Sequence, residues 1–66
     1  MNETTLLSSQ LDLISTLNQL GLYGMAENFR IQASNPNIYQ GLSFEERLSD
    51  LTEAQQDHLR QKTLER

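Results

Sequence analysis

The strongest constraint on the fold is a helix start at residues 43–46. Ser43 is a favourable N-cap residue, and Glu46 follows it at the spacing of a capping box. In a capping box the serine hydroxyl and the glutamate carboxylate each accept a backbone N–H of the other residue. Neither proline nor glycine interrupts residues 43–66. The sequence therefore predicts one helix of about 20 residues or more at the end of the chain.

A first, shorter helix is predicted to begin near Ser9 and to end at Gly21. Ser9 and Asp12 have the spacing of a capping box, and Gly21 can adopt the left-handed conformation that ends many helices. The apolar residues between them spread over about half of the helical wheel. They are Leu11, Leu13, Ile14, Leu17 and Leu20. A stripe this wide predicts a helix that is contacted from two sides.

A second helix is predicted over residues 22–34, because its apolar residues recur at helical spacing on one narrow face. They are Leu22, Met25, Ala26, Phe29 and Ala33. We expect Met25 and Phe29 to belong to the core, and Gly24 to let a neighbouring helix approach closely. Pro36 excludes the preceding residue from helical geometry and should end this helix.

The apolar face of the long helix becomes polar along its length. Phe44, Leu48 and Leu51 line up, whereas Gln55 and His58 continue the same stripe. We therefore expect only the first two or three turns to pack on the earlier helices, with Phe44 and Leu48 as anchors. The predicted fold is all-α: a frayed segment at residues 1–8, then a helical domain at 9–66 in which a short hairpin packs on the start of a long C-terminal helix.

Size and charge limit the possible functions. A single domain of 66 residues has a core that rarely supplies more than about 3–5 kcal/mol, and this chain has no cysteine to reinforce it. A partner or oligomerisation is the remaining source of stability. The formal charge of −4 is evenly distributed, with −2 in residues 1–40 and −2 in residues 41–66. Binding to phosphates needs clustered lysine and arginine, so this balance disfavours stand-alone binding of nucleic acid or of an anionic membrane.

No residues form a recognisable catalytic, cofactor or metal motif. The three glycines are scattered, and no P-loop is present. His58 beside Asp57 or Glu53 could act as an acid–base pair, but a solvated histidine on a charged helix is the favoured interpretation. We predict that the chain is not an enzyme and binds no cofactor or metal. No stretch has the features of a signal peptide or a membrane span, which favours a cytoplasmic location.

Two blocks of sequence resemble the N-terminal region of the IstB-like ATP-binding proteins, the transposition helper proteins of certain bacterial insertion sequences. The blocks are LNQLGLYGMAE at residues 17–27 and LSFEERL at residues 42–48. They match in order and in spacing, and the likeness covers roughly residues 6–60. Two features depart from the family: Tyr23 stands where proline is common, and the region after Leu51 is poorer in arginine.

This resemblance implies a function in DNA transposition. Family members carry a helical N-terminal domain followed by an AAA+ ATPase domain, assemble on DNA with ATP, and work with a transposase. The chain would then be the N-terminal domain, its last helix leading into an absent ATPase domain that alone would bind ATP and Mg²⁺. The implied role is a non-catalytic interaction and assembly domain that contacts neighbouring protomers, as a homo-oligomer, or the transposase.

Two alternatives remain open from the sequence: a DNA-binding helical module of the same system, and a stand-alone helical protein-interaction domain. DNA contact would rely on the scattered basic residues of the long helix, and it is disfavoured by their small number. The candidate interaction surface consists of Glu45, Arg47, Arg60 and Lys62. Arg47 is also expected to pair with Asp50, three residues later on the same helix.

Overall fold

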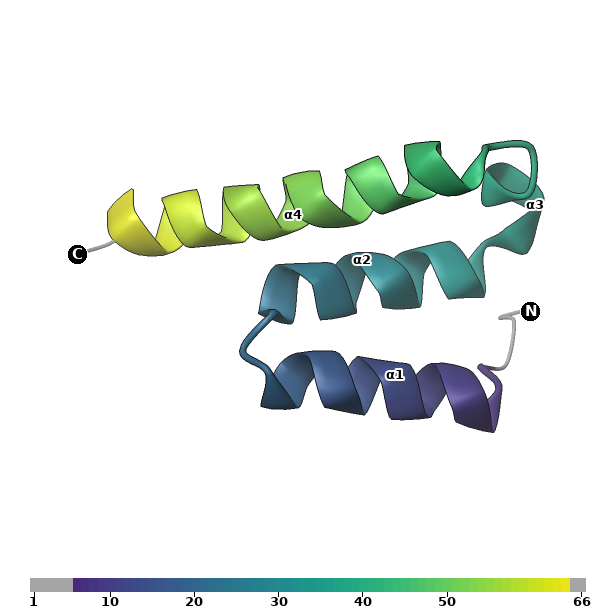
Figure 1. The fold of residues 1–66 in the computed structure, drawn as a ribbon, viewed down its shortest axis with the longest axis horizontal. Helices are drawn as coiled ribbons and strands as arrows, with labels where there is room; N and C mark the ends of the chain where they lie inside the picture. Colours follow the sequence, from purple (N-terminus) through teal and green to yellow (C-terminus); the bar gives the residue numbers. More distant parts are fainter. Residues whose placement is uncertain (1–5, 65–66) are drawn as a thin grey trace.

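The computed structural model describes residues 6–64, and every regular element in this range is a helix. The elements are α1 (Ser8–Gln19), α2 (Tyr23–Ser34), α3 (Pro36–Tyr39) and α4 (Phe44–Leu64). Helices α1, α2 and α4 run antiparallel to their neighbours, with α2 in the middle (Figure 1). The predicted all-α fold with a long C-terminal helix is confirmed. The helix contacted from two sides is α2, whereas the sequence predicted α1.

The start of α1 differs from the prediction. The N-cap is Leu7 rather than Ser9, and the Leu7 N–H donates to the Gln10 side-chain oxygen at 2.8 Å. Ser9 is already helical, so its hydroxyl cannot take the N-cap position. Of the segment predicted to be frayed, residues 1–5 lie outside the described part of the chain. Ser8 is the first residue of α1.

The end of α1 confirms the prediction for Gly21. This glycine has a φ of 81°, in the left-handed region that residues with a Cβ rarely adopt. The Gly21 N–H donates to the Asn18 carbonyl at 3.0 Å, and the Leu22 N–H donates to the Leu17 carbonyl at 2.9 Å. This pair of bonds is a Schellman motif, and it satisfies two carbonyl groups that the helix leaves open. It turns the chain directly from α1 into α2.

Pro36 separates α2 from a helical turn that the sequence analysis did not predict. Helix α2 ends at Ser34, and Asn35 has a non-helical φ of −129°, as expected for a residue before proline. Pro36 then occupies the first position of α3, where its missing N–H costs no helical hydrogen bond. This single turn carries the chain across the end of α2 towards α4 (Figure 1).

The capping box at the start of α4 is confirmed. The Ser43 N–H donates to a Glu46 carboxylate oxygen at 2.8 Å, and the Glu46 N–H donates to the Ser43 hydroxyl at 3.1 Å. Glu45 and Glu46 both lie in the first turn, where the helix dipole favours negative charge. The start of the longest helix is thus determined by local sequence.

The packing of α4 on α2 extends beyond Leu51, where the sequence predicted that it would end. Gly24 lies so close to α4 that an added Cβ would be 2.6 Å from the Ala54 carbonyl oxygen and 2.8 Å from the Gln55 Cα. The same Cβ would be 2.9 Å from the His58 Cβ. Small and polar residues of α4 can pack here because Gly24 presents only backbone. The predicted role of Gly24 is confirmed, and the predicted limit of the packing is wrong.

Phe44 and Leu48 do not anchor α4 as predicted. Phe44 is 69% exposed, and Leu48 is also exposed. For Phe44 the physical reason lies in where α2 meets α4: the Gln32 side-chain amide donates to the Arg47 carbonyl at 3.0 Å. Phe44 lies about one turn before this contact and is therefore beyond the packed part of the interface.

Among the described residues, very little apolar surface is fully buried. Ala26 of α2, 3% exposed, is the one buried hydrophobic residue, and no large side chain is completely enclosed. Met25 and Phe29, the predicted core residues, are half-buried. Leu13 of α1 and Leu20, the C-cap of this helix, are 52% and 67% exposed. The apolar stripe of α1 is therefore only partly covered by α2.

The close approach at Gly24 predicts an asymmetry between two glycine-to-alanine substitutions. Gly24→Ala should destabilise the fold by about 1–3 kcal/mol, because the new methyl group meets the backbone of α4. Gly41→Ala is the matched control, since a Cβ there meets no atom within 4 Å, and it should change stability by about 0.5 kcal/mol or less. Urea unfolding followed by circular dichroism measures both. Equal effects would contradict the close approach.

The structure at the start of α4 predicts that the capping residue Ser43 contributes more to the free energy of unfolding than the large apolar side chain of Phe44. Ser43→Ala should cost about 0.5–2 kcal/mol through loss of the capping box. Phe44→Ala should cost less than about 1 kcal/mol, because Phe44 is mostly exposed. Thermal melts of the two variants show which substitution causes the larger loss of stability. A larger loss for Phe44→Ala would place this side chain in the core.

Candidate protein-interaction site

The four residues of the predicted interaction surface do not gather on one face of α4. Glu45 and Arg47 point in directions about 160° apart, since a helix turns by about 100° per residue. Glu45 and Arg60 are separated by about 22 Å along the axis, at about 1.5 Å per residue. Lys62 lies in the last turn. No single partner surface is defined by this set.

The basic residues of this set have separate surroundings. Arg60 pairs with Asp57, with 3.1 Å between the guanidinium nitrogen and the carboxylate oxygen. Arg47 lines a hollow of about 180 Å³ at the end of the bundle, beside Phe29 and Gln40. Within residues 6–64, the predicted ion pair between Arg47 and Asp50 is not formed.

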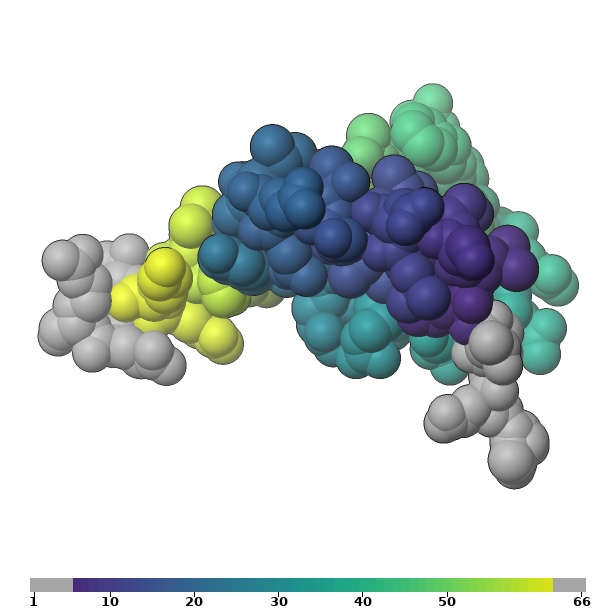
Figure 2. All heavy atoms as spheres, turned by 90° about the horizontal axis from the view of Figure 1, so that it is seen from below, coloured from purple at the N-terminus to yellow at the C-terminus, as the bar shows by residue number. Residues whose placement is uncertain are grey.

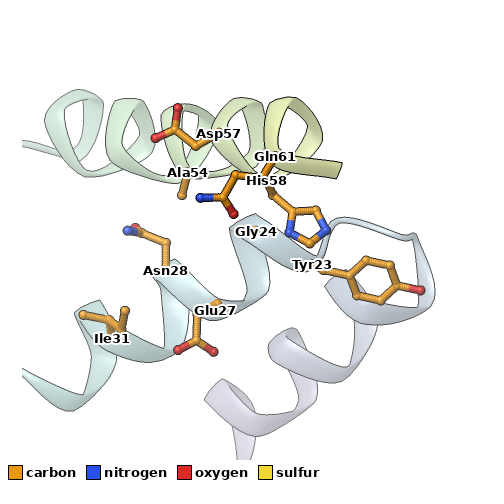
Figure 3. A pocket seen from close by; sticks show the side chains of 9 residues that line it. All are labelled: Tyr23, Gly24, Glu27, Asn28, Ile31, Ala54, Asp57, His58 and Gln61. Carbon is orange, nitrogen blue, oxygen red and sulfur yellow. The ribbon is translucent and has the colours of Figure 1, made fainter. Parts of the chain in front are cut away.

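A groove lies between α2 and α4, and we call it the α2–α4 groove. It has a volume of about 410 Å³ and is open to solvent (Figure 3). The residues that line it are Tyr23, Gly24, Glu27, Asn28, Ile31, Ala54, Asp57, His58 and Gln61. Gly24 and Ala54 line it where the backbones of the two helices approach closely. The groove is thus a direct consequence of the close approach of the two helices.

Tyr23 and His58 close one end of the α2–α4 groove. Their ring centroids are 5.9 Å apart, with the planes inclined by 60°, which is a favourable tilted geometry for aromatic rings. Tyr23 is half exposed, and His58 is half-buried. The sequence favoured a solvated histidine at position 58. The structure corrects this, because the close contact at Gly24 brings His58 against the start of α2.

Carboxylates lie along both edges of the α2–α4 groove. Glu27 stands on the α2 edge and Asp57 on the α4 edge, and they point to opposite sides in Figure 3. An adjoining hollow along α4 is lined by Asp50 and Glu53 as well as Asp57. Residues 50, 53 and 57 share one face of α4 because their spacing is helical. The α4 edge of the groove is therefore acidic, and Glu27 adds a carboxylate on the α2 edge.

Glu27 has a local partner. Arg30 donates to the Glu27 carboxylate through both Nε, at 3.3 Å, and a terminal guanidinium nitrogen. These hydrogen bonds, together with the positive charge of Arg30, lower the pKa of Glu27 below its usual value. The Glu27 carboxylate therefore stays ionised over a wider range of acidic pH than an isolated glutamate. Both side chains remain about half exposed, so the pair adds little stability.

Two buried glutamines were missed by the sequence analysis. Gln55 is 9% exposed, and its side-chain oxygen accepts the Met25 N–H at 3.1 Å. Gln32 is also buried, and its amide donates to the Asn28 side chain at 2.8 Å and to the Arg47 carbonyl. The available signal was the position of Gln55 on the stripe of Leu51. Both glutamines join the helices and lie outside the set of exposed groove residues.

Two further findings concern the described part of the chain alone. Residues 6–64 contain no group of three histidine, aspartate or glutamate side chains placed to hold a metal ion. No helix in the described part of the chain is long and apolar enough to cross a membrane.

The chemistry of the α2–α4 groove, with carboxylates and an aromatic ring, is suited to binding cationic groups.

Comparison of the chain with protein-family models, with curated proteins and with solved structures gives no match.

Proposed function

We propose that this chain is a non-catalytic interaction and assembly domain of an ATP-dependent DNA transposition helper protein. Its partners would be neighbouring protomers or the transposase, in the cytoplasm. The two sequence blocks at residues 17–27 and 42–48 motivate the assignment to transposition. The exposed leucines of α1 support the interaction role, and they are the observation that carries it.

The leucines of α1 have the composition of an interface. Leu7, just before α1, and Leu11, Leu13 and Leu20 are all more than half exposed. The helix itself contains a single charged residue, Asp12. The centres of protein interfaces are depleted in charge, and burial of one leucine contributes roughly 1.5–3 kcal/mol. Leu13 and Leu20, seven residues apart, share one face, whereas Leu11 points about 160° away from Leu13. The face of Leu13 and Leu20 therefore offers a surface that a partner can cover at little cost in desolvated charge.

The small core supports the same proposal. A domain that encloses no large side chain within its described residues has little apolar burial to offset chain entropy. A partner that binds only the folded state adds stability in proportion to its concentration and affinity. Covering α1 would thus both form the assembly and stabilise the domain.

Direct DNA binding by this domain is less well supported. Arg47, Arg60 and Lys62 project in different directions, and Arg60 already pairs with Asp57. Phosphate contacts need clustered cations, and their number sets the salt dependence of binding. In the proposed protein, DNA and ATP would be bound through the ATPase domain that the resemblance implies.

The proposed role predicts concentration-dependent association through α1. Analytical ultracentrifugation should show a mass above the 7.6 kDa of one chain as its concentration rises, or co-sedimentation with the transposase. The double variant Leu13→Gln/Leu20→Gln should reduce either association by at least about tenfold, because Leu20, the C-cap of α1, lies on the same side of the helix as Leu13.

Ile38→Gln is the matched control for this experiment. It makes the same kind of change at an exposed residue of α3, outside α1, and it should leave the association intact. Equal losses in the control and the double variant would contradict a specific interface on α1. A chain that stays monomeric and does not bind the transposase would contradict the proposed function.

A further inference from the structure

We infer that the α2–α4 groove binds a segment of a partner protein that carries arginine or lysine together with aliphatic side chains. This surface is separate from α1, and the inference does not depend on the leucines of that helix. It rests on three features of the groove: its size and apolar lining, the charges on its edges, and the aromatic ring at its end.

The size and lining of the groove suit side chains of a polypeptide. Its volume of about 410 Å³ lies within the range of roughly 300–1,000 Å³ that is usual for ligand sites. Ile31 and Tyr23 are partly exposed, and with Ala54 and Gly24 they supply the apolar part of a lining that also contains the polar Asn28 and Gln61. Aliphatic side chains, including the stems of lysine and arginine, can cover this apolar surface while their charged ends stay solvated.

The charges on the edges select a cationic partner. Glu27 and Asp57 flank the groove, and Asp50 and Glu53 continue the acidic edge along α4. Within the described part of the chain, Asp50 and Glu53 form no ion pair. The two edges together carry four carboxylates against Arg30 and Arg60, so nucleic acid and anionic lipid would be repelled, whereas a basic segment would be attracted.

The arginines near the groove do not block this binding. Arg30 and Arg60 each pair with a carboxylate of their own helix three residues away, and these pairs are largely exposed. Exposed pairs of this kind contribute about 0–1 kcal/mol, so a cation from a partner can replace them at little cost. The carboxylates of Glu27 and Asp57 thus remain usable as binding groups.

Tyr23 adds a preference for cations that carry an aliphatic stem. It is half exposed and is held at one end of the groove by its contact with His58 (Figure 3). The face of a tyrosine ring attracts an ammonium or guanidinium group within about 6 Å. The combination of an aromatic ring, carboxylates and apolar surface therefore favours arginine or lysine over a small inorganic cation.

Fluorescence anisotropy with a labelled peptide of alternating leucine and arginine tests this inference. The chain should bind this peptide, the affinity should fall as salt rises, and a peptide with glutamate in place of arginine should not bind. Glu27→Gln/Asp57→Asn should weaken binding by at least about tenfold, and Tyr23→Leu should weaken it about threefold or more.

Asp12→Asn/Glu45→Gln is the matched control, because it removes the same net charge from residues that do not line the groove. Its affinity for the peptide should stay within about twofold of the unmodified chain. Equal weakening in the two double variants would show that net charge alone attracts the peptide and would overturn the inference. Failure of the arginine peptide to bind at low salt would also overturn it.

Discussion

The fold depends on the close contact between α2 and α4, where Gly24 meets the backbone at Ala54 and Gln55. At this point Gln55 supplies a hydrogen-bond acceptor to the Met25 N–H, in the first turn of α2. The N-cap of α2 is Leu22, whose side chain has no oxygen to accept such a bond. A distant helix therefore performs the capping that the local sequence of α2 lacks. The Gln32 bond to the Arg47 carbonyl ties the other end of the same pair of helices.

This way of joining the helices explains both exposed surfaces. Since the closest contact is made by backbone and amide groups, α2 and α4 need no large apolar side chains between them. The leucines of α1 stay partly uncovered, and the groove opens beside the narrow contact at Gly24 (Figure 2 shows α1 in front of α2 and α4). A small domain that is joined by polar contacts is well suited to complete its burial with a partner.

Local signals in the sequence predicted most parts of the fold that depend on nearby residues; the exception is the start of α1, where Leu7 and not Ser9 is the N-cap. Gly21, Pro36 and the Ser43–Glu46 box each act within a few residues, and each is found as expected. Predictions that depend on distant packing were less accurate: Phe44 is exposed, whereas Gln55 is buried. The polarity of Gln55 suggested that its side chain would be exposed to solvent. Its burial instead depends on a hydrogen bond from the Met25 N–H, 30 residues earlier, which has no acceptor within its own helix. The groove was not predictable for the same reason, because its two sides come from different helices.

Amide hydrogen exchange of Met25 tests the central contact most directly. First-turn amides of a helix usually exchange fast, because they have no acceptor within the helix. The contact with Gln55 predicts slow exchange of the Met25 N–H in the unmodified chain, close to the rate set by global unfolding. In Gln55→Ala the rate should rise at least about tenfold, whereas Gln56→Ala, an exposed neighbour, should leave it unchanged. Equally fast exchange in all three proteins would contradict the capping of α2 by α4.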